Sequence, residues 1–277
     1  TDAEPFCLAV SFGPPHNPYQ EVPDKYREMY TAAEIDFRPN CSEIPEDCLD
    51  PAWAQRKSTR DFYALVTSLD DMLGRMLSKL EELGIADDTI VVFTADHGDM
   101  LWSQGLLYKC VPYDEALRVP LLVRYPAGLP AGREVGAPVA SVDLLPTLAG
   151  LAGWQQADTF EGHNYSELLQ GTPGAEEPES ALAAIYHRYQ FRPDFPVPEW
   201  RCLATRRYTY SERVGREPWL VFDNEEDPYQ MTNLASDPDA EDLREEMSAR
   251  LDARLRKVGD PFLSKEEMRQ RFGLGLG

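Results

Sequence analysis

A carboxylate and an imidazole follow one of the most apolar runs of the sequence. Asp96 and His97 come after residues 89–94, and Gly98 follows them directly. A carboxylate at the end of a strand is a hard ligand for a divalent cation, and a glycine lets the backbone turn close to it. In an open parallel sheet, ligands bind beyond the carboxyl ends of the strands. The Asp96 carboxylate therefore predicts a divalent-metal site.

Two further side chains suit the hydrolysis of an anionic ester at such a metal. Lys109 comes thirteen residues after Asp96, and His16 follows a second apolar run, residues 5–12. The metal would polarise the ester oxygen, the lysine would hold the non-bridging oxygens, and the histidine would protonate the leaving oxygen. Each of these residue types taken singly is more often a helix cap or a solvated side chain. The hypothesis depends on their joint arrangement.

The elements expected to position these residues alternate between strands and helices. Residues 5–12, 89–94 and 120–125 are apolar enough for strands buried on both faces. Residues 54–83 repeat apolar side chains at three- and four-residue spacing, and residues 142–152 predict a second helix. This alternation predicts an α/β fold in which helices flank a parallel sheet. Three strands are few for such a sheet, so we expect it to be incomplete in this chain.

The composition changes at residues 171–180, a linker rich in glycine, proline and glutamate. Short apolar runs beyond it predict a small antiparallel sheet, covered by an amphipathic helix at residues 239–257. The predicted domains are residues 1–170, part of an α/β domain, residues 181–260, a small α+β subdomain, and residues 261–277, a loosely held tail.

The charge and the apolar pattern restrict the partners. The net charge is −21 and the pI about 4.5, so nucleic acid and anionic membrane surfaces are repelled and are not expected as partners. A protein this acidic must bind an anionic ester through a metal or a few placed cations. The sequence contains no apolar run long enough to span a membrane and begins with no signal peptide, which leaves the compartment unknown.

The five cysteines include no zinc-type Cys-x-x-Cys pair. Cys7 and Cys202 lie in apolar runs and are expected to be small buried hydrophobes. Cys41 and Cys48 flank a polar loop, where a disulfide is the alternative to two thiols.

Several motifs, in the same order along the chain, resemble those of the sulfatase family. Residues 89–126 contain Thr-Ala-Asp-His-Gly-Asp and end in Arg-Val-Pro-Leu-Leu-Val-Arg-Tyr-Pro. The segment 5–19 resembles the family's Pro-His strand, and the segment 141–153 resembles its Asp-x-x-Pro-Thr helix. The segment 220–234 resembles its C-terminal Asp-Pro and Asn-Leu signature. The resemblance implies an alkaline-phosphatase-like fold, with residues 1–170 as the C-terminal part of the catalytic domain. It also implies a sulfuric-ester hydrolase that acts on a sulfated small molecule or carbohydrate.

The same resemblance implies roles for individual residues. Asp96 and His97 would ligate or border a divalent cation, usually Ca²⁺ in this family. Lys109 would contact the sulfate, and His16 would lie near the ester oxygen. Gln104 stands where many members carry a histidine, so it can hydrogen-bond to the substrate but cannot titrate.

The family's nucleophile has no counterpart in this sequence. It is a formylglycine made from the first residue of Cys/Ser-x-Pro/Ala-x-Arg, and it lies upstream of the motifs found here, as do two metal-binding aspartates. The resemblance therefore implies that a preceding N-terminal segment of the same protein completes the site, and that this chain alone is inactive. Residues 202–206 fit the motif, but they follow Asp96 and lie in a strand pattern, whereas the family's motif opens a helix. We do not expect Cys202 to be the nucleophile.

Two alternatives stay open. A phosphate or phosphonate ester hydrolase of the same superfamily would use the same metal and cations. A degenerate or processed chain without catalysis is the other, although the presence of Asp96, His97, Lys109 and His16 argues against degeneration. Outside the site, the sequence predicts a structural Glu115–Arg118 pair, a helix-capping Asp143 and structural histidines at positions 163 and 187.

Overall fold

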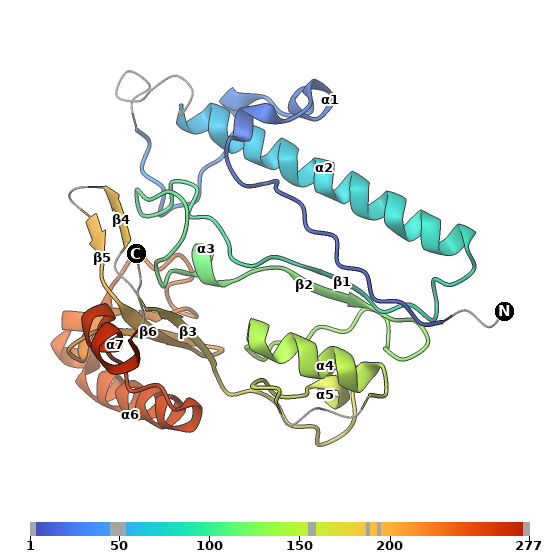
Figure 1. The fold of residues 1–277 in the computed structure, drawn as a ribbon. Coiled ribbons are helices and arrows are strands. Elements are labelled where there is room, and N and C mark those ends of the chain that lie inside the picture. The colour runs from blue at the N-terminus through green and yellow to red at the C-terminus, as the bar shows by residue number, and fades with distance from the viewer. Residues whose placement is uncertain (1–3, 45–53, 155–158, 187–188, 193–194, 274–277) are drawn as a thin grey trace. The chain divides into compact units, whose positions relative to one another are not determined.

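The computed structural model describes the chain except for residues 1–3, 45–53, 155–158, 187–188, 193–194 and 274–277 (Figure 1). Two compact units are present. The first unit comprises Thr1–Phe37 and Ser42–Ala86, and the second comprises Arg38–Cys41 and Asp87–Gly277. The predicted domain boundaries differ from this division and stay a prediction.

The first unit is built on one long helix, α2, Gln55–Glu82. Its formation agrees with the predicted helix over residues 54–83, and Gly84, with a φ of 69°, ends it. The short helix α1, Asp24–Arg27, and two 3-10 turns, Tyr19–Glu21 and Ala32–Glu34, pack on α2. Tyr26 Oη donates to Asp71 Oδ2 at 2.8 Å, and the Tyr19 ring meets the Phe62 ring edge-on at 5.8 Å.

Residues 5–12 do not form the buried strand that the sequence predicts. The segment is extended and unpaired with any strand of the described residues, and Phe6 and Leu8 are 62% and 74% exposed. Cys7 is likewise exposed, which corrects its prediction as a buried residue. An apolar run specifies a strand only when a neighbouring strand supplies its hydrogen-bond partners.

The α/β part of the second unit contains β1, Val91–Thr94, and β2, Leu121–Arg124. The two strands pair antiparallel, with Val91 opposite Arg124, and no residue of either is fully buried. The α/β class is confirmed, but the parallel direction predicted for this pair is wrong. Only the short helix α3, Asp114–Leu117, lies between the strands, and parallel neighbours require a crossover over the sheet. The helices α4, Leu144–Leu151, and α5, Ser166–Gln170, follow.

The C-terminal part of the second unit confirms the predicted antiparallel sheet with a helix. Its four strands run in the order β3-β6-β7-β8, and β4 pairs with β5 as a separate hairpin. The helix α6 covers the sheet, and α7 begins at a Ser264–Glu267 capping box in the region predicted as a loose tail. The bounds are Ala181–Ile185 for β3, Tyr189–Arg192 for β4, Phe195–Val197 for β5, Trp200–Ala204 for β6, Tyr208–Arg213 for β7, Glu217–Asp223 for β8, Glu241–Val258 for α6 and Lys265–Phe272 for α7.

Alternation along the strands gives this sheet two buried faces. One face, which includes Leu203, Tyr210 and Val221, packs against Met247 and Leu251 of α6. The other face packs against the segment of residues 100–116 through Trp200, Cys202, Leu220 and Phe222. The sheet therefore supports the loop that follows the predicted metal site.

Cys202 is confirmed as a buried residue of strand β6. Its side chain is 0% exposed, and burial raises the pKa of its thiol far above the ordinary value. A thiol kept protonated inside a sheet is unsuited to nucleophilic attack.

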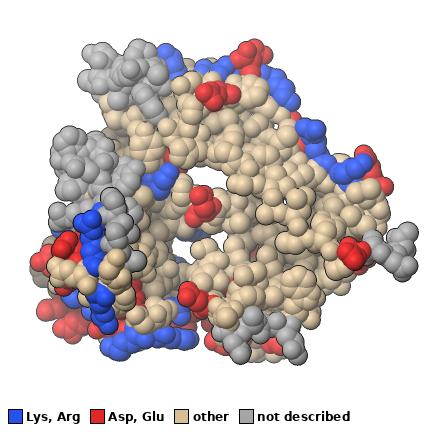
Figure 2. Space-filling model, viewed as in Figure 1, with Lys and Arg blue, Asp and Glu red and all other residues tan. Residues whose placement is uncertain are grey.

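The surface carries charges of both signs. Figure 2 shows Lys and Arg side chains among Asp and Glu side chains over the C-terminal helices α6 and α7. Among the helices that the structure describes, none combines the length and apolarity needed to cross a membrane.

Candidate functional site

Asp96 and His97 lie just beyond the end of β1, where their side chains form a pair of candidate metal ligands. The Asp96 carboxylate is 87% exposed, and its Oδ2 lies 3.5 Å from His97 Nε2. His97 Nδ1 lies 2.7 Å from the carbonyl oxygen of Gly98. Because Nδ1 donates to a carbonyl, Nε2 is the ring nitrogen that faces the carboxylate. A carboxylate oxygen and an imidazole nitrogen that lie 3.5 Å apart suit the binding of one cation by both atoms.

Gly98 holds this pair against the start of the next element. Its N–H donates to the carbonyl of Ala116 at 2.9 Å. A Cβ atom at this position would lie 1.9 Å from the carbonyl oxygen of Glu115. Only glycine allows the backbone after Asp96 and His97 to approach α3 so closely.

Lys109 lies on a loop with an unusual backbone. Of the positive-φ residues other than glycine in the described chain, five fall within residues 101–110: Leu101, Trp102, Gln104, Tyr108 and Cys110. Hydrogen bonds close the loop on itself, from Met100 N to Tyr108 O at 2.7 Å and from Trp102 N to Leu106 O at 2.8 Å. Residues in this φ region persist where the surroundings over-determine them, and they concentrate at functional sites.

Gln230 is one of the residues that tie this loop to the C-terminal sheet. Its side chain is buried, and its Nε2 donates to Thr209 Oγ1 at 3.2 Å and to Asn224 Oδ1 at 2.9 Å. Its Oε1 accepts from the backbone N–H of Asp114 at 2.9 Å. The neighbouring carbonyls of Tyr229 and Gln230 accept from Gln104 Nε2 at 3.1 and 3.0 Å. The only sequence signal for Gln230 is its position inside the 220–234 motif.

These contacts restrict what Gln104 can offer a substrate. The donors of its side-chain amide are engaged by the two backbone carbonyls. Substrate binding by Gln104 stays a prediction, and its remaining polar group is the acceptor Oε1.

The segment of residues 38–41 lines the same loop. The carbonyl of Asn40 accepts from Gln104 N at 2.8 Å, and Cys41 forms a β-bridge with Ser103. Asn40 Nδ2 donates to Glu115 Oε1 at 2.7 Å and to the carbonyl of Tyr229 at 2.9 Å.

The predicted Glu115–Arg118 pair is wrong. Arg118 pairs with Asp114 at 3.3 Å, and Arg38 lies 3.1 Å from the 8%-exposed Glu115 carboxylate. Two residues three apart on a helix as short as α3 need not pair with each other, because residues outside the helix can reach their side chains. Burial raises the pKa of Asp114, although Arg118 opposes this shift.

His16 belongs to the first unit, whereas Asp96, His97, Gln104 and Lys109 belong to the second. The His16 ring is exposed, with Nδ1 2.7 Å from the carbonyl oxygen of Asn17. Its place beside the ester oxygen stays a prediction.

The residues present fit part of a metal site. In the part of the chain that the structure describes, no three His, Cys, Asp or Glu side chains gather closely enough to hold a metal. Asp96 and His97 supply two donors of suitable chemistry, so a complete site needs further ligands.

The other predicted residues have structural roles. Asp143 Oδ2 accepts from Ala140 N at 3.0 Å and its Oδ1 from His163 N at 2.9 Å, so its carboxylate is structural, but it makes no side-chain cap bond to α4 and the predicted helix cap is wrong. His163 stacks on Tyr165 at 4.9 Å between ring centroids, as a structural histidine. His187 and Cys48, and with it the possible Cys41–Cys48 disulfide, lie outside the described residues.

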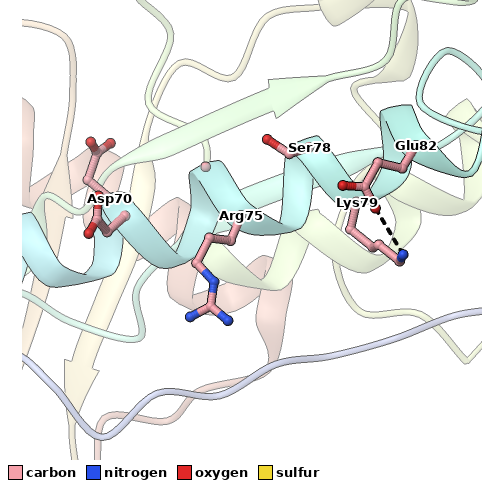
Figure 3. Close-up of a pocket in the computed structure, with 7 residues that line it drawn as sticks. Asp70, Arg75, Ser78, Lys79 and Glu82 are labelled. Carbon is pink, nitrogen blue, oxygen red and sulfur yellow. Dashed lines mark hydrogen bonds and ion pairs between the residues drawn. The ribbon is translucent and has the colours of Figure 1, made fainter.

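A surface hollow of about 530 Å³ lies along α2, away from these residues in the sequence. Its lining comes from that helix alone, including Asp70, Arg75 and Ser78, and Lys79 pairs with Glu82 at 3.0 Å (Figure 3). A hollow lined by one helix face of paired charges has no convergent groups for catalysis.

Comparison with known proteins identifies the family. Residues 1–154 match the sulfatase family, and residues 103–257 match the family described as N-sulphoglucosamine sulphohydrolase, C-terminal. The chain is 34% identical to the ulvan-active sulfatase of Formosa agariphila, over 100% of this chain and 53% of the relative. It is 29% identical to an N-acetylglucosamine-6-O-sulfatase of Bacteroides thetaiotaomicron, over 77% of this chain and 38% of the relative. The chain spans about half the length, or less, of these curated relatives.

Solved structures agree with these matches. A putative sulfatase from Bacteroides fragilis is 29% identical and has a TM-score of 0.77, over 94% of this chain and 55% of that chain. The phosphonate monoester hydrolase of Agrobacterium radiobacter, 22% identical, has a TM-score of 0.73 over 90% of this chain and 56% of that chain, which shows a shared fold alone. Since the family match over residues 1–154 covers more than half of the sequence, the chain belongs to the sulfatase family of the alkaline-phosphatase superfamily.

Proposed function

We propose that the protein containing this chain is a sulfuric-ester hydrolase that cleaves a sulfate monoester with a divalent metal, which we expect to be calcium. The observation that carries the proposal is the Asp96–His97 pair. Its carboxylate Oδ2 and its imidazole Nε2 converge at 3.5 Å beyond the end of β1. The hydrogen bond from Nδ1 to the Gly98 carbonyl orients the ring so that Nε2 is the nitrogen beside the carboxylate.

Each residue of the chain would have one task. When bound, a divalent cation supplies Lewis-acid polarisation of the ester oxygen. Asp96 and His97 Nε2 would hold the cation, and Lys109 would hold the non-bridging sulfate oxygens as a point charge. His16 donates a proton to the leaving oxygen. Gln104 uses its amide donors to hold the loop that carries Lys109.

The remaining parts of the site would come from a preceding segment of the same protein. The chain spans about half of its relatives, and the cysteine of its only Cys-x-Ala-x-Arg sequence is buried in β6. We place a formylglycine nucleophile and the other metal ligands in that segment. The chain alone is therefore expected to be inactive.

The substrate class follows from the relatives. One of them is named an N-acetylglucosamine-6-O-sulfatase, which supports a sulfated carbohydrate as the substrate of this protein. The family likeness of the C-terminal part to N-sulphoglucosamine sulphohydrolase supports the same class.

The test compares the full-length protein with its Asp96→Ala variant, both produced with the formylglycine-generating enzyme. We expect hydrolysis of 4-nitrophenyl sulfate and bound calcium in the first, and loss of both in the second. Asp87→Ala is the control, because Asp87 is 83% exposed and lies 3.9 Å from Arg124. Unchanged calcium content in Asp96→Ala would reject the metal assignment.

The two alternatives predict other outcomes of the same assay. Faster turnover of a 4-nitrophenyl phosphonate ester than of the sulfate would favour a phosphonate hydrolase, a class that shares this fold. Turnover of neither ester by a folded, calcium-loaded protein would favour a non-catalytic chain.

A further inference from the structure

Arg38 is a half-exposed cation whose guanidinium is only partly engaged by neighbouring side chains. Its side chain is 50% exposed, and its Nε lies 3.1 Å from Glu115 Oε1. Its guanidinium carbon lies 5.2 Å from the centroid of the Tyr229 ring. Among the described residues, its two terminal nitrogens donate no hydrogen bond, and its ion pair with Glu115 is made through Nε. A guanidinium carries five N–H donors, so the N–H groups of the two terminal nitrogens stay available for an anion.

The guanidinium is held in place before any ligand arrives. The Glu115 carboxylate that anchors it is 8% exposed and also accepts from Asn40 Nδ2 at 2.7 Å. The Tyr229 ring supports it from another side through a cation–π contact. An arginine fixed by a buried carboxylate and a ring loses less side-chain entropy when it binds an oxyanion.

Arg38 also lies beside the loop that carries the proposed site. Tyr229 contacts Arg38 through its ring and Gln104 through its carbonyl oxygen, which is 3.1 Å from Gln104 Nε2. Asn40, two residues after Arg38, accepts from Gln104 N at 2.8 Å. Gln104 stands between Asp96 and Lys109 in the sequence. Arg38 therefore lies next to the loop that connects these two residues.

The geometry points to Arg38 as a specificity-determining residue that binds a second oxyanion of the substrate, a sulfate or carboxylate beyond the sulfate that is cleaved. The inference rests on the proposed function and deepens it, because it assigns the substrate to saccharides that carry more than one anionic group. A planar fork matches the two oxygens of such a group. In a protein with a net charge of −21, an anion binds only where a cation is placed for it.

The experiment measures equilibrium binding by calorimetry in the full-length protein with calcium. Expression without the formylglycine-generating enzyme prevents turnover. The probes are glucosamine 6-sulfate, glucosamine N,6-disulfate and a 6-sulfated glucosamine–uronate disaccharide. We expect the unsubstituted protein to bind one of the two dianionic probes about tenfold more tightly than the monosulfate, the scale of one charge-assisted hydrogen-bonded pair. Arg38→Gln should abolish that preference and change monosulfate affinity less than about twofold.

A second pair of variants separates ligand binding from the structural role of Arg38. Arg38→Gln leaves the buried Glu115 carboxylate without its counter-ion and should lower Tm, whereas Arg38→Gln with Glu115→Gln removes both charges and should restore Tm. The double variant should still lack the dianion preference. Arg118→Gln is the matched control, because Arg118 is 81% exposed, pairs with another carboxylate of α3 and should keep the preference.

Two results would overturn the inference. One is an unsubstituted protein with no preference for either dianionic probe, and the other is a double variant that regains the preference together with its Tm. Neither result depends on turnover, whereas the proposed function is tested by the ester turnover of the converted protein and by the calcium content of its Asp96→Ala variant.

Discussion

The side-chain amide of Gln104 donates to the backbone carbonyl of Gln230 at 3.0 Å, joining residues that are 126 positions apart. Gln104 belongs to the strained loop between the metal pair and Lys109, and Gln230 is buried against the C-terminal sheet. The small C-terminal sheet thereby takes part in shaping the site, although it contributes none of the predicted catalytic residues. A loop with five positive-φ residues needs such external support.

Replacing Gln104 by leucine should damage both stability and activity. The carbonyls of Tyr229 and Gln230 would lose a donor, which should lower the free energy of unfolding by about 1 to 2 kcal/mol. With the loop less restrained, kcat/KM of the full-length protein for 4-nitrophenyl sulfate should fall by about tenfold or more. Gln270→Leu on the exposed face of α7 is the control, because its amide donates to Glu266, one turn earlier on the same helix, at 3.0 Å. Equal effects of the two variants on kcat/KM would contradict the role of Gln104.

Replacing Lys109 by alanine should reduce transition-state stabilisation with little effect on folding. The expected loss in kcat/KM of the full-length enzyme is on the order of a hundredfold, the scale of one removed oxyanion contact. Lys79→Ala is the matched control, since that lysine is 63% exposed on α2 and pairs with Glu82. If Lys109→Ala lowers kcat/KM less than about threefold, Lys109 is an ordinary solvated lysine.

Gly98→Ala should be strongly unfavourable. Its new Cβ would lie 1.9 Å from the carbonyl oxygen of Glu115, so either the turn after Asp96 or the start of α3 must shift. We expect a loss of about 2 to 3 kcal/mol in the free energy of unfolding, measured by urea denaturation, together with weaker calcium binding. Gly74→Ala in the middle of α2 meets no atom within 4 Å and should instead stabilise the protein by about 0.5 to 1 kcal/mol. A Gly98→Ala variant as stable as the parent would show that this close approach is not required.

The Arg201–Asp260 ion pair should make stability depend on acid pH. Burial alone would raise the pKa of Asp260, but hydrogen bonds from Arg201 and the Phe262 N–H outweigh it and hold that pKa below its usual value. A lowered pKa in the folded state stabilises the protein above the unfolded pKa, and this contribution is lost as pH falls below about 4. Asp260→Asn should cost on the order of 3 kcal/mol near neutral pH, because Arg201 is 0% exposed and would keep an uncompensated charge.

Thermal unfolding from pH 7 to pH 3 checks this expectation. The Tm difference between the parent and Asp260→Asn should stay constant down to about pH 5 and shrink below about pH 4. Asp87→Asn, at an 83%-exposed position, should show no such difference. A pH-independent gap for Asp260→Asn would refute the assignment.

Local patterns predicted the elements whose residues interact within one turn or one strand. The three- and four-residue spacing of residues 54–83 corresponds to α2, and the short alternating runs after residue 180 correspond to the antiparallel sheet under α6. The buried strand position of Cys202 was predictable for the same reason. The family motifs, read in order, predicted the family that the comparisons confirm.

The same reasoning failed where a residue's partner lies far away in the sequence. An apolar run at residues 5–12 does not specify which strand will pair with it, and the run forms no strand among the described residues. The spacing of Glu115 and Arg118 predicted a pair, but Glu115 takes its partners from residues 38–40. Gln230 carried no charge or periodicity that could reveal its role.

By itself, the sequence determined the helix α2 and the antiparallel sheet with α6, because these elements depend on residues that are neighbours in the chain. It also supplied the residue types at the candidate metal and anion positions. Only the tertiary structure decided that β1 and β2 pair antiparallel, that Gln230 holds the loop before Lys109, and that Arg38 is anchored by Glu115. The physical reason is that hydrogen bonds and ion pairs are short-ranged and directional. Which distant groups come within about 3 Å of each other follows from how the elements pack, and local periodicity does not encode that packing.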